Sequence, residues 1–300
     1  MMQLKKIKIL QLGTLILLCF ASIWSFFEWG LKKPLFYKPK IYDCFMILNE
    51  LDLLEVHLAE LYNHVDKFVI VECIERQNGK LKPLYFKENK QRYAKYLDKI
   101  IHVVVKERPY LGVEDPWQRE FFQRNQIMRG LKKCKASDII IITDLDEILR
   151  GDRIKSMVKR LHKNKDPVLV PILDFYRNFY NRKDPNLATG PILTNYKHLK
   201  KTSPQKVRDR RFGHMTFSKG GWHFSGMGGW KVNWEKANSF SHWREVLADE
   251  NNTDPQKKYE GIKKNFKLVE IDETFPQYIR EHLDEFYQKG FLDKEGGSFQ

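Results

Sequence analysis

The residues best suited to chemistry are the acids of one short segment, Asp144-Leu145-Asp146-Glu147. Asp144 and Asp146 are one residue apart, so in an extended segment their side chains would point the same way. Carboxylate oxygens are good ligands for Mn²⁺ and Mg²⁺, and a diphosphate supplies further ligands to such a cation. The segment therefore predicts a site for a divalent cation and a nucleotide. An acidic turn that caps the next helix is the alternative.

A histidine and a basic run are further candidates for binding. His223 lies in residues 220–230, which are rich in glycine and aromatic side chains. Glycines let a backbone approach a ligand closely, and a neutral imidazole is a suitable ligand for Mn²⁺. A core histidine bonded to a carbonyl is the alternative. Residues 197–211 carry many basic side chains, which form either a solvated loop or a contact to a diphosphate or an acidic ligand.

A buried strand is predicted to position the acids. Residues 138–143 contain four consecutive isoleucines without alternation, which is typical of a parallel strand covered on both faces. Further strands are predicted at residues 41–48, 67–73, 99–105 and 168–173, and helices at 50–65, 116–133, 255–268 and 275–289. This order indicates an α/β fold with an open, mostly parallel sheet flanked by helices. Ligands of such sheets lie outside the carboxyl ends of the strands, here near Glu50, Glu72 and the acidic segment.

The N-terminal region predicts a membrane anchor. Residues 9–27 are uncharged, and a helix of this length spans about 28 Å, close to the hydrocarbon thickness of a bilayer. We expect a basic tail at 1–8, a transmembrane signal-anchor at 9–29, a stem at 30–40 and one globular domain at 41–300. A cleaved signal peptide is the alternative, although its apolar region would be shorter and followed by small residues.

Composition narrows the class of protein. A hydrophobic fraction of 42% with 13% aromatic residues is typical of a globular chain. The formal net charge of +15 attracts phosphates of any kind. No nucleic-acid recognition motif accompanies this charge, so we do not expect a nucleic-acid partner.

Several ordered motifs resemble a known family. They are residues 42–55 (YDCFMILNELDLLE), 68–72 (FVIVE), 82–86 (KPLYF), 117–125 (WQREFFQRN), 143–148 (TDLDEI), 221–225 (GWHFS) and 239–242 (SFSH). Together they resemble glycosyltransferase family 17, the family of β-1,4-mannosyl-glycoprotein 4-β-N-acetylglucosaminyltransferase. The resemblance covers most of residues 41–290.

The resemblance implies a GT-A-like catalytic domain that inverts the anomeric carbon. The implied donor is a UDP-sugar, UDP-GlcNAc by analogy, and the implied acceptor is a glycan or glycoprotein, with the β-mannose of an N-glycan core as one candidate. It implies a divalent metal held by Asp144, Asp146 and His223. It places near the donor Glu50, Glu72, Arg124, Asn125 and Asp144. The corresponding location is a single-pass type II membrane protein, facing the Golgi lumen if the source is eukaryotic.

Two departures leave the acceptor open. The family pattern has a glutamate two residues after SFSH, whereas this chain has Arg244 there and Glu245 next. The chain also lacks the longer extensions of the animal enzyme. An inverting transfer needs a general base for the acceptor hydroxyl, and Asp174 and Glu245 are the candidates.

Two other functions use the same features. A metal-dependent phosphodiesterase or nuclease would share the acids and the basic surface, but a two-metal site needs more histidine and aspartate ligands than this one cluster offers. A non-catalytic, membrane-tethered glycan-binding module would not need Asp144 and Asp146. Replacing those two residues discriminates it from an enzyme.

Overall fold

The computed structural model describes residues 37–163, 165–239, 254, 256–257, 261 and 265–293. The chain divides into two units, Met1–Pro39 and Lys40–Gln300, and the fold below is that of the second. Within the described residues, no helix has the length and apolar character needed to cross a bilayer. The predicted anchor at 9–29 and the candidate base Glu245 lie outside the described residues.

Four predicted strands form the parallel half of a 10-stranded sheet, in the order β3-β2-β1-β4. They are β1 (Ile41–Ile47), β2 (Lys67–Cys73), β3 (Ile100–Val105) and β4 (Ile139–Ile142). All four isoleucines of β4 are fully buried. Ile139 and Ile141 pack into one hydrophobic core and Ile140 and Ile142 into another, so β4 is covered on both faces as predicted.

The other half of the sheet is mainly antiparallel, so the prediction of a mostly parallel sheet is wrong there. Its strands are β5 (Glu147–Leu149), β6 (Val168–Arg177), β7 (Arg182–Thr189), β8 (Ile192–Asn195), β9 (Met215–Ser225) and β10 (Lys267–Leu268). In this half only β6 and β9 pair in parallel. The cause is the short connections, such as residues 178–181 between β6 and β7, because a parallel pair needs a crossover of a dozen residues or more.

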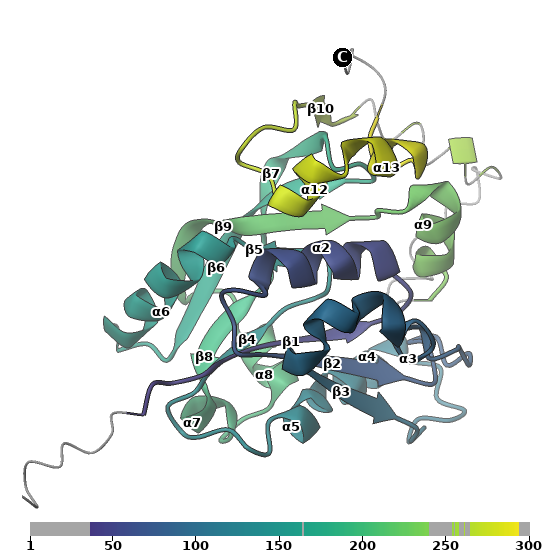
Figure 1. Ribbon diagram of the computed structural model, residues 1–300. Helices are drawn as coiled ribbons and strands as arrows, with labels where there is room; N and C mark the ends of the chain where they lie inside the picture. The colour runs from purple at the N-terminus through teal and green to yellow at the C-terminus, as the bar shows by residue number, and fades with distance from the viewer. Residues whose placement is uncertain are drawn as a thin grey trace, which may run out of the picture. The chain divides into compact units, whose positions relative to one another are not determined.

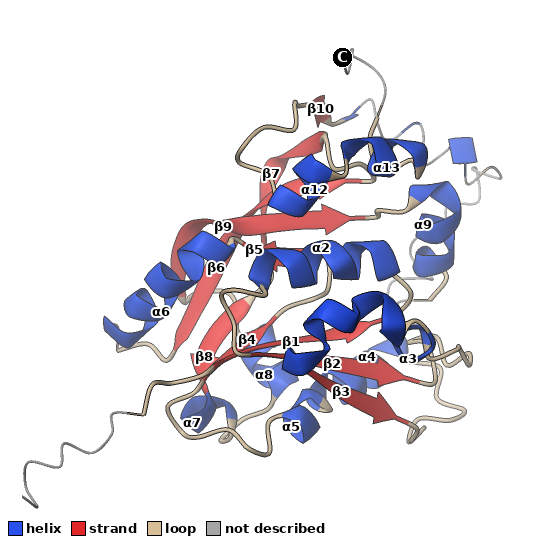
Figure 2. Ribbon diagram, viewed as in Figure 1, coloured by secondary structure: helices blue, strands red, loops and turns tan. Residues whose placement is uncertain are grey.

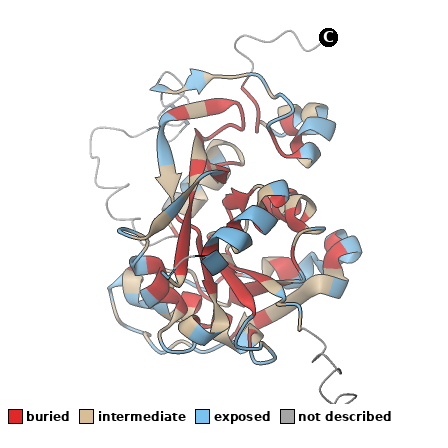
Figure 3. Cartoon of the chain, turned by 90° about the vertical axis from the view of Figure 1, so that its left-hand side faces the viewer, coloured by how far each residue is buried: buried red, intermediate tan, exposed pale blue. Residues whose placement is uncertain are grey.

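Helices cover both faces of the sheet, as Figures 1 and 2 show. One face carries α2 (Leu51–Leu61), η1 (Lys90–Lys99) and α6 (Ile154–Lys163). The other carries α4 (Pro116–Asn125), α5 (Ile127–Gly130), α7 (Tyr196–Leu199) and α8 (Pro204–Asp209). The remaining elements are α3 (Tyr85–Glu88), η2 (Gly151–Arg153), α9 (Gly229–Ala237), α12 (Gln277–Glu281) and α13 (Leu283–Gln288). Buried residues follow the strands and the inner sides of the helices (Figure 3).

Local sequence explains where the helix before β4 begins. Asp115 caps α4 by accepting a hydrogen bond from the Trp117 backbone N–H at 3.0 Å, and Pro116 is the first helical residue, as predicted. The predicted helix 116–133 is divided at Gln126 into α4 and α5. This chain direction brings Arg124, in the last turn of α4, toward the end of β4.

Candidate active site

The acidic segment follows β4 directly and forms a turn. The Glu147 N–H donates to the Asp144 carbonyl at 3.0 Å, and the Asp144 N–H donates to Glu147 Oε2 at 2.8 Å. The segment from Asp144 to Asp146 is therefore a turn, and the prediction that it is extended is wrong. The turn sends the two carboxylates to different basic partners.

The Asp144 carboxylate is held by two guanidinium groups. Arg124 Nη2 is 3.0 Å from Oδ1, and Arg208 Nη2 is 2.5 Å from Oδ2. Burial alone would raise the pKa of Asp144, but the charges of Arg208 and Arg124 outweigh it and lower the pKa. Both arginines are almost fully buried, whereas the Asp144 side chain is 37% exposed. The carboxylate is therefore ionised and open to solvent on one side.

The Asp146 carboxylate has a different set of partners. Lys236 Nζ, from α9, is 2.9 Å from Oδ2, and His223 Nε2, from β9, is 3.5 Å from Oδ1. Burial would raise the pKa of Asp146, but Lys236 and His223 outweigh it and hold the pKa far below its usual value. Lys236 Nζ also lies 3.0 Å from Glu50 Oε1. Glu50, Asp146 and His223, three of the residues predicted for the donor or the metal, are thus brought together.

Arg208 connects the acidic turn to the neighbouring strands. Its guanidinium donates to both Glu147 carboxylate oxygens at 2.8 and 2.9 Å and to the Gly190 carbonyl at 2.7 Å. Gly190 leaves room for this arrangement, since a Cβ at that position would lie 1.6 Å from Glu147 Oε1 and would displace the Glu147 carboxylate. The buried Glu147 therefore anchors Arg208, which in turn orients Asp144.

Asn125 supports this arrangement from α4 without facing the acids. Its side-chain oxygen accepts a hydrogen bond from the Gln205 N–H at 3.0 Å, and the Gln205 side chain contacts Arg124. Asn125 therefore joins α4 to α8, which carry the two arginines that hold Asp144.

Two other predicted residues lie in different surroundings. Glu72 is fully buried and accepts hydrogen bonds from the Phe86 N–H at 2.7 Å and from His102 Nε2 at 2.9 Å. It therefore anchors the start of α3. Asp174 pairs with Arg150 at 3.2 Å and Lys183 at 2.8 Å.

Asp174 also lies on the wrong face of β6 for the acidic turn. The neighbouring Phe175 stacks on His223 at a centroid distance of 4.6 Å, and successive strand residues point to opposite faces. The structure therefore does not bring Asp174 to Asp146, and Glu245 is outside the described residues.

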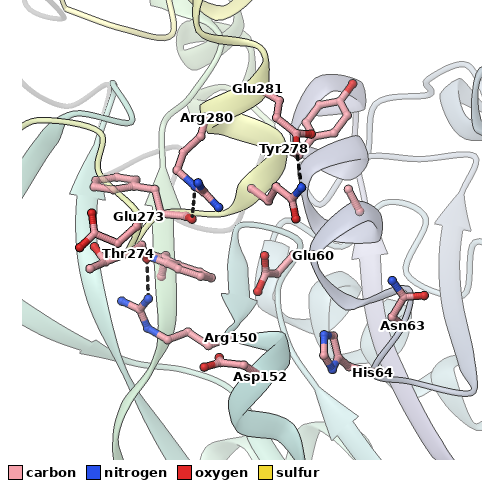
Figure 4. A pocket seen from close by; sticks show the side chains of 14 residues that line it. Glu60, Asn63, His64, Arg150, Asp152, Glu273, Thr274, Tyr278, Arg280 and Glu281 are labelled. Carbon is pink, nitrogen blue, oxygen red and sulfur yellow. Dashed lines mark hydrogen bonds between the residues drawn. The ribbon is translucent and has the colours of Figure 1, made fainter.

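A separate cavity of about 400 Å³ lies on the Arg150 side. Its lining includes Glu60, His64, Arg150, Trp222 and Tyr278. Figure 4 shows Glu60 between Arg280 and Glu281 above and Arg150 and Asp152 below. None of the residues predicted for the donor or the metal lines this cavity.

The donor atoms fit a cation that takes most of its ligands from a substrate. Across the described part of the chain, no group of three or more His, Cys, Asp or Glu side chains is arranged to hold a metal. Mg²⁺ sites commonly use only one or two carboxylates together with substrate phosphates. Asp146 supplies one such carboxylate, whose Oδ1 lies 3.5 Å from His223 Nε2 and whose Oδ2 is paired with Lys236. Asp144 is their neighbour, but both its oxygens already bind guanidinium groups.

The sequence did not predict individual roles for three residues that contact the acidic turn or form part of it. Arg208 lies inside the basic run 197–211, for which a contact to a diphosphate was one of two interpretations. Glu147 was grouped with the acids but given no role. No sequence pattern marks Lys236, because a helical lysine that binds a buried acid looks the same in sequence as one exposed to solvent.

Comparison with solved structures gives remote likenesses. A mannosyltransferase from Pyrobaculum calidifontis in complex with GDP-Man and Mn²⁺ is 15% identical, covers 82% of this chain and 76% of its own, and has a TM-score of 0.43. TarS 1–349 of S. aureus is 12% identical, covers 84% and 74%, and has a TM-score of 0.37. Likenesses at this level carry no argument about function.

Sequence comparison is more specific. The β-1,4-mannosyl-glycoprotein 4-β-N-acetylglucosaminyltransferases of Rattus norvegicus and Homo sapiens are 30% and 29% identical over 122 residues, or 38% of this chain. The match spans only 22% and 23% of the length of those relatives. The sequence model of glycosyltransferase family 17 matches residues 20–270. The prediction of the family is confirmed, and the chain belongs to glycosyltransferase family 17.

Proposed function

We propose that this chain transfers a sugar, N-acetylglucosamine or a related one, from a UDP-sugar to a glycan acceptor with inversion, in a GT-A-like catalytic domain. The observation that carries the proposal is the acidic turn at the end of β4, where Asp144 is held by arginines of α4 and α8 and Asp146 by a lysine of α9. Such alternating charges suit a ligand that combines phosphates with a cation. The relatives' name supports N-acetylglucosamine as the sugar.

Each charged group has a role in this proposal. Arg124 and Arg208 fix the Asp144 carboxylate, whose exposed side faces the ligand. Asp146 and His223 would hold a divalent cation, which when bound neutralises charge on the departing nucleoside diphosphate. The Lys236 ammonium, already between Glu50 and Asp146, offers a second positive charge to the phosphates.

Three parts of the proposal go beyond the described residues. Glu245 is the remaining candidate for the general base, since Asp174 faces away from the turn. Residues 9–29 would anchor the chain as a type II membrane protein, with the catalytic domain in the Golgi lumen of a eukaryotic source. The β-mannose of an N-glycan core is the first acceptor to test, because the relatives' name contains a β-1,4-mannosyl-glycoprotein.

A donor screen with the full chain in detergent tests the proposal. UDP-GlcNAc, other UDP-sugars and GDP-mannose are each supplied with Mn²⁺ or with EDTA, and release of the nucleoside diphosphate is measured. We expect metal-dependent release from a UDP-sugar, lowered at least about 100-fold by Asp146→Asn. Asp284→Asn, at an exposed position of α13, is the matched control and should be unchanged. Release that persists in EDTA would refute the metal-dependent mechanism.

A further inference from the structure

A fully buried histidine lies directly beneath the acidic turn. His57, on α2, places Nδ1 2.9 Å from the Leu145 carbonyl oxygen and Nε2 2.6 Å from Asp43 Oδ2. Both side chains have no exposed surface. Leu145 is the residue between Asp144 and Asp146, so one hydrogen bond joins the interior of the protein to the middle of the turn.

The chemistry of these contacts fixes which atom donates. A carbonyl oxygen only accepts, so His57 Nδ1 carries the hydrogen and donates to Leu145. Nε2 and the Asp43 carboxyl group share one further proton. Burial alone would lower the pKa of His57, but the Asp43 charge and hydrogen bond outweigh it and raise the pKa. The Asp43 Oδ1 atom has no partner in the described part of the chain, so His57 is the group that satisfies this carboxyl.

Every carbonyl of the turn has its own restraint. The Asp144 carbonyl accepts from the Glu147 N–H at 3.0 Å, and the Asp146 carbonyl accepts from the Phe224 N–H of β9 at 2.8 Å. The Leu145 carbonyl depends instead on the His57 side chain. A change of ψ at Leu145 that is not compensated by the next residue would carry Asp146 with it and shift its carboxylate relative to His223 and Lys236, and the His57 bond opposes that change.

We infer that His57, held by Asp43, is a positioning residue for sugar transfer. It does not touch the substrate. Its Nδ1–H bond to Leu145 fixes the backbone that holds the Asp146 carboxylate where a cation and a diphosphate would bind. The inference rests on the proposed transfer, and it adds a residue that acts through the backbone of the acidic turn. Displacements of about 1 Å in such a site lower rates by up to about 100-fold.

Two double variants separate this role from general packing. An asparagine amide nitrogen occupies about the place of Nδ1, and a glutamine amide nitrogen that of Nε2. His57→Asn/Asp43→Asn therefore keeps a donor for Leu145, whereas His57→Gln/Asp43→Asn keeps only a contact to residue 43. Both lose the imidazole ring, and both remove the buried carboxylate that a lone substitution of His57 would leave without a partner. The full chain is assayed with the active UDP-sugar and Mn²⁺, and kcat, donor KM and the unfolding midpoint are measured.

We expect the glutamine pair to lower kcat about 10- to 100-fold below the asparagine pair, at similar unfolding midpoints. Equal kcat values for the two pairs, or losses that follow the unfolding midpoints, would overturn the positioning role while leaving the proposed function intact. A wild-type chain that turns over no nucleotide sugar would overturn both, because the inference depends on the transfer.

Discussion

The link between Arg208 and the acidic turn makes a quantitative prediction. Replacing Arg208 with methionine preserves much of the side-chain volume and removes the charge. The substitution deletes hydrogen bonds to Asp144, to both oxygens of Glu147 and to the Gly190 carbonyl. Asp144 keeps Arg124 as a partner and is partly exposed, so the loss of its bond to Arg208 costs little stability. Glu147 is 5% exposed and, among the described residues, keeps only the Asp144 backbone N–H as a hydrogen-bond donor.

The magnitude follows from the stranded Glu147 carboxylate. Removing one partner of a buried ion pair costs about 3–5 kcal/mol, mostly because the other charge remains buried and unpaired. We therefore expect Arg208→Met to lower the free energy of unfolding by about 3–5 kcal/mol. The double variant Arg208→Met/Glu147→Gln removes the stranded charge and should recover about 1–3 kcal/mol of that loss.

The assay is urea unfolding at pH 7, followed by circular dichroism and tryptophan fluorescence. Arg210→Met is the matched control, because Arg210 follows the same helix but is exposed, and it should change stability by no more than about 0.5 kcal/mol. A loss below about 1 kcal/mol for Arg208→Met, or no recovery in the double variant, would show that Arg208 and Glu147 do not pair in the folded protein.

Three further predictions concern other parts of the domain. Glu72→Gln should lower the free energy of unfolding by about 1–3 kcal/mol without changing kcat per folded molecule, since Glu72 anchors α3; a raised donor KM in the release assay would restore its predicted donor role. Gly221→Ala places a Cβ 2.1 Å from the Ile148 carbonyl oxygen, so a destabilisation of at least about 2 kcal/mol is expected in urea, whereas an unchanged midpoint would contradict the β5–β9 pairing. Asp52 is partly buried, yet hydrogen bonds from Lys289 and Arg92 lower its pKa in the folded protein. Its ion pairs therefore contribute up to about 1 kcal/mol to the free energy of unfolding above about pH 3.9, and this contribution is lost as pH falls through the folded pKa. The stability gap between wild type and Asp52→Asn should therefore close at low pH, and a gap that widens there would refute the sign.

The strands of the parallel half were predictable because burial on both faces leaves a strong sequence pattern. The run Ile139–Ile142 has no polar residue at any position, and a strand so composed has no place at the surface. The antiparallel half left a weaker pattern. Strand β7 contains Pro185 and several polar residues, and its pairing with β6 depends on a short connection whose direction no periodicity reports.

The grouping of the candidate residues could be predicted from the sequence, but their side-chain directions could not. The rule that ligands lie at the carboxyl ends of strands singled out Asp144, Asp146 and Glu50, and the structure places Glu50 and Asp146 around one lysine. This rule does not report side-chain direction. Glu72 is also at a strand end, but its side chain points into the core, where it accepts a hydrogen bond from α3. Lys236 lies on α9, which follows β9 in the chain, and it reaches the cluster because α9 packs beside the acidic turn, a contact that no local sequence pattern reports.

The sequence positions of the basic side chains determine when the candidate site can form during synthesis. Glu50 is near the start of the described chain, whereas Lys236 comes 186 residues later, and Arg124 and Arg208 lie between them. During synthesis the acids of the turn emerge before two of their three cationic partners. The carboxylates of the turn therefore remain hydrated until the later segments α8 and α9 fold against them, which requires the closure of long loops. A chain that terminates before α9 would retain most of its hydrophobic interior but not the charge balance on which ligand capture depends.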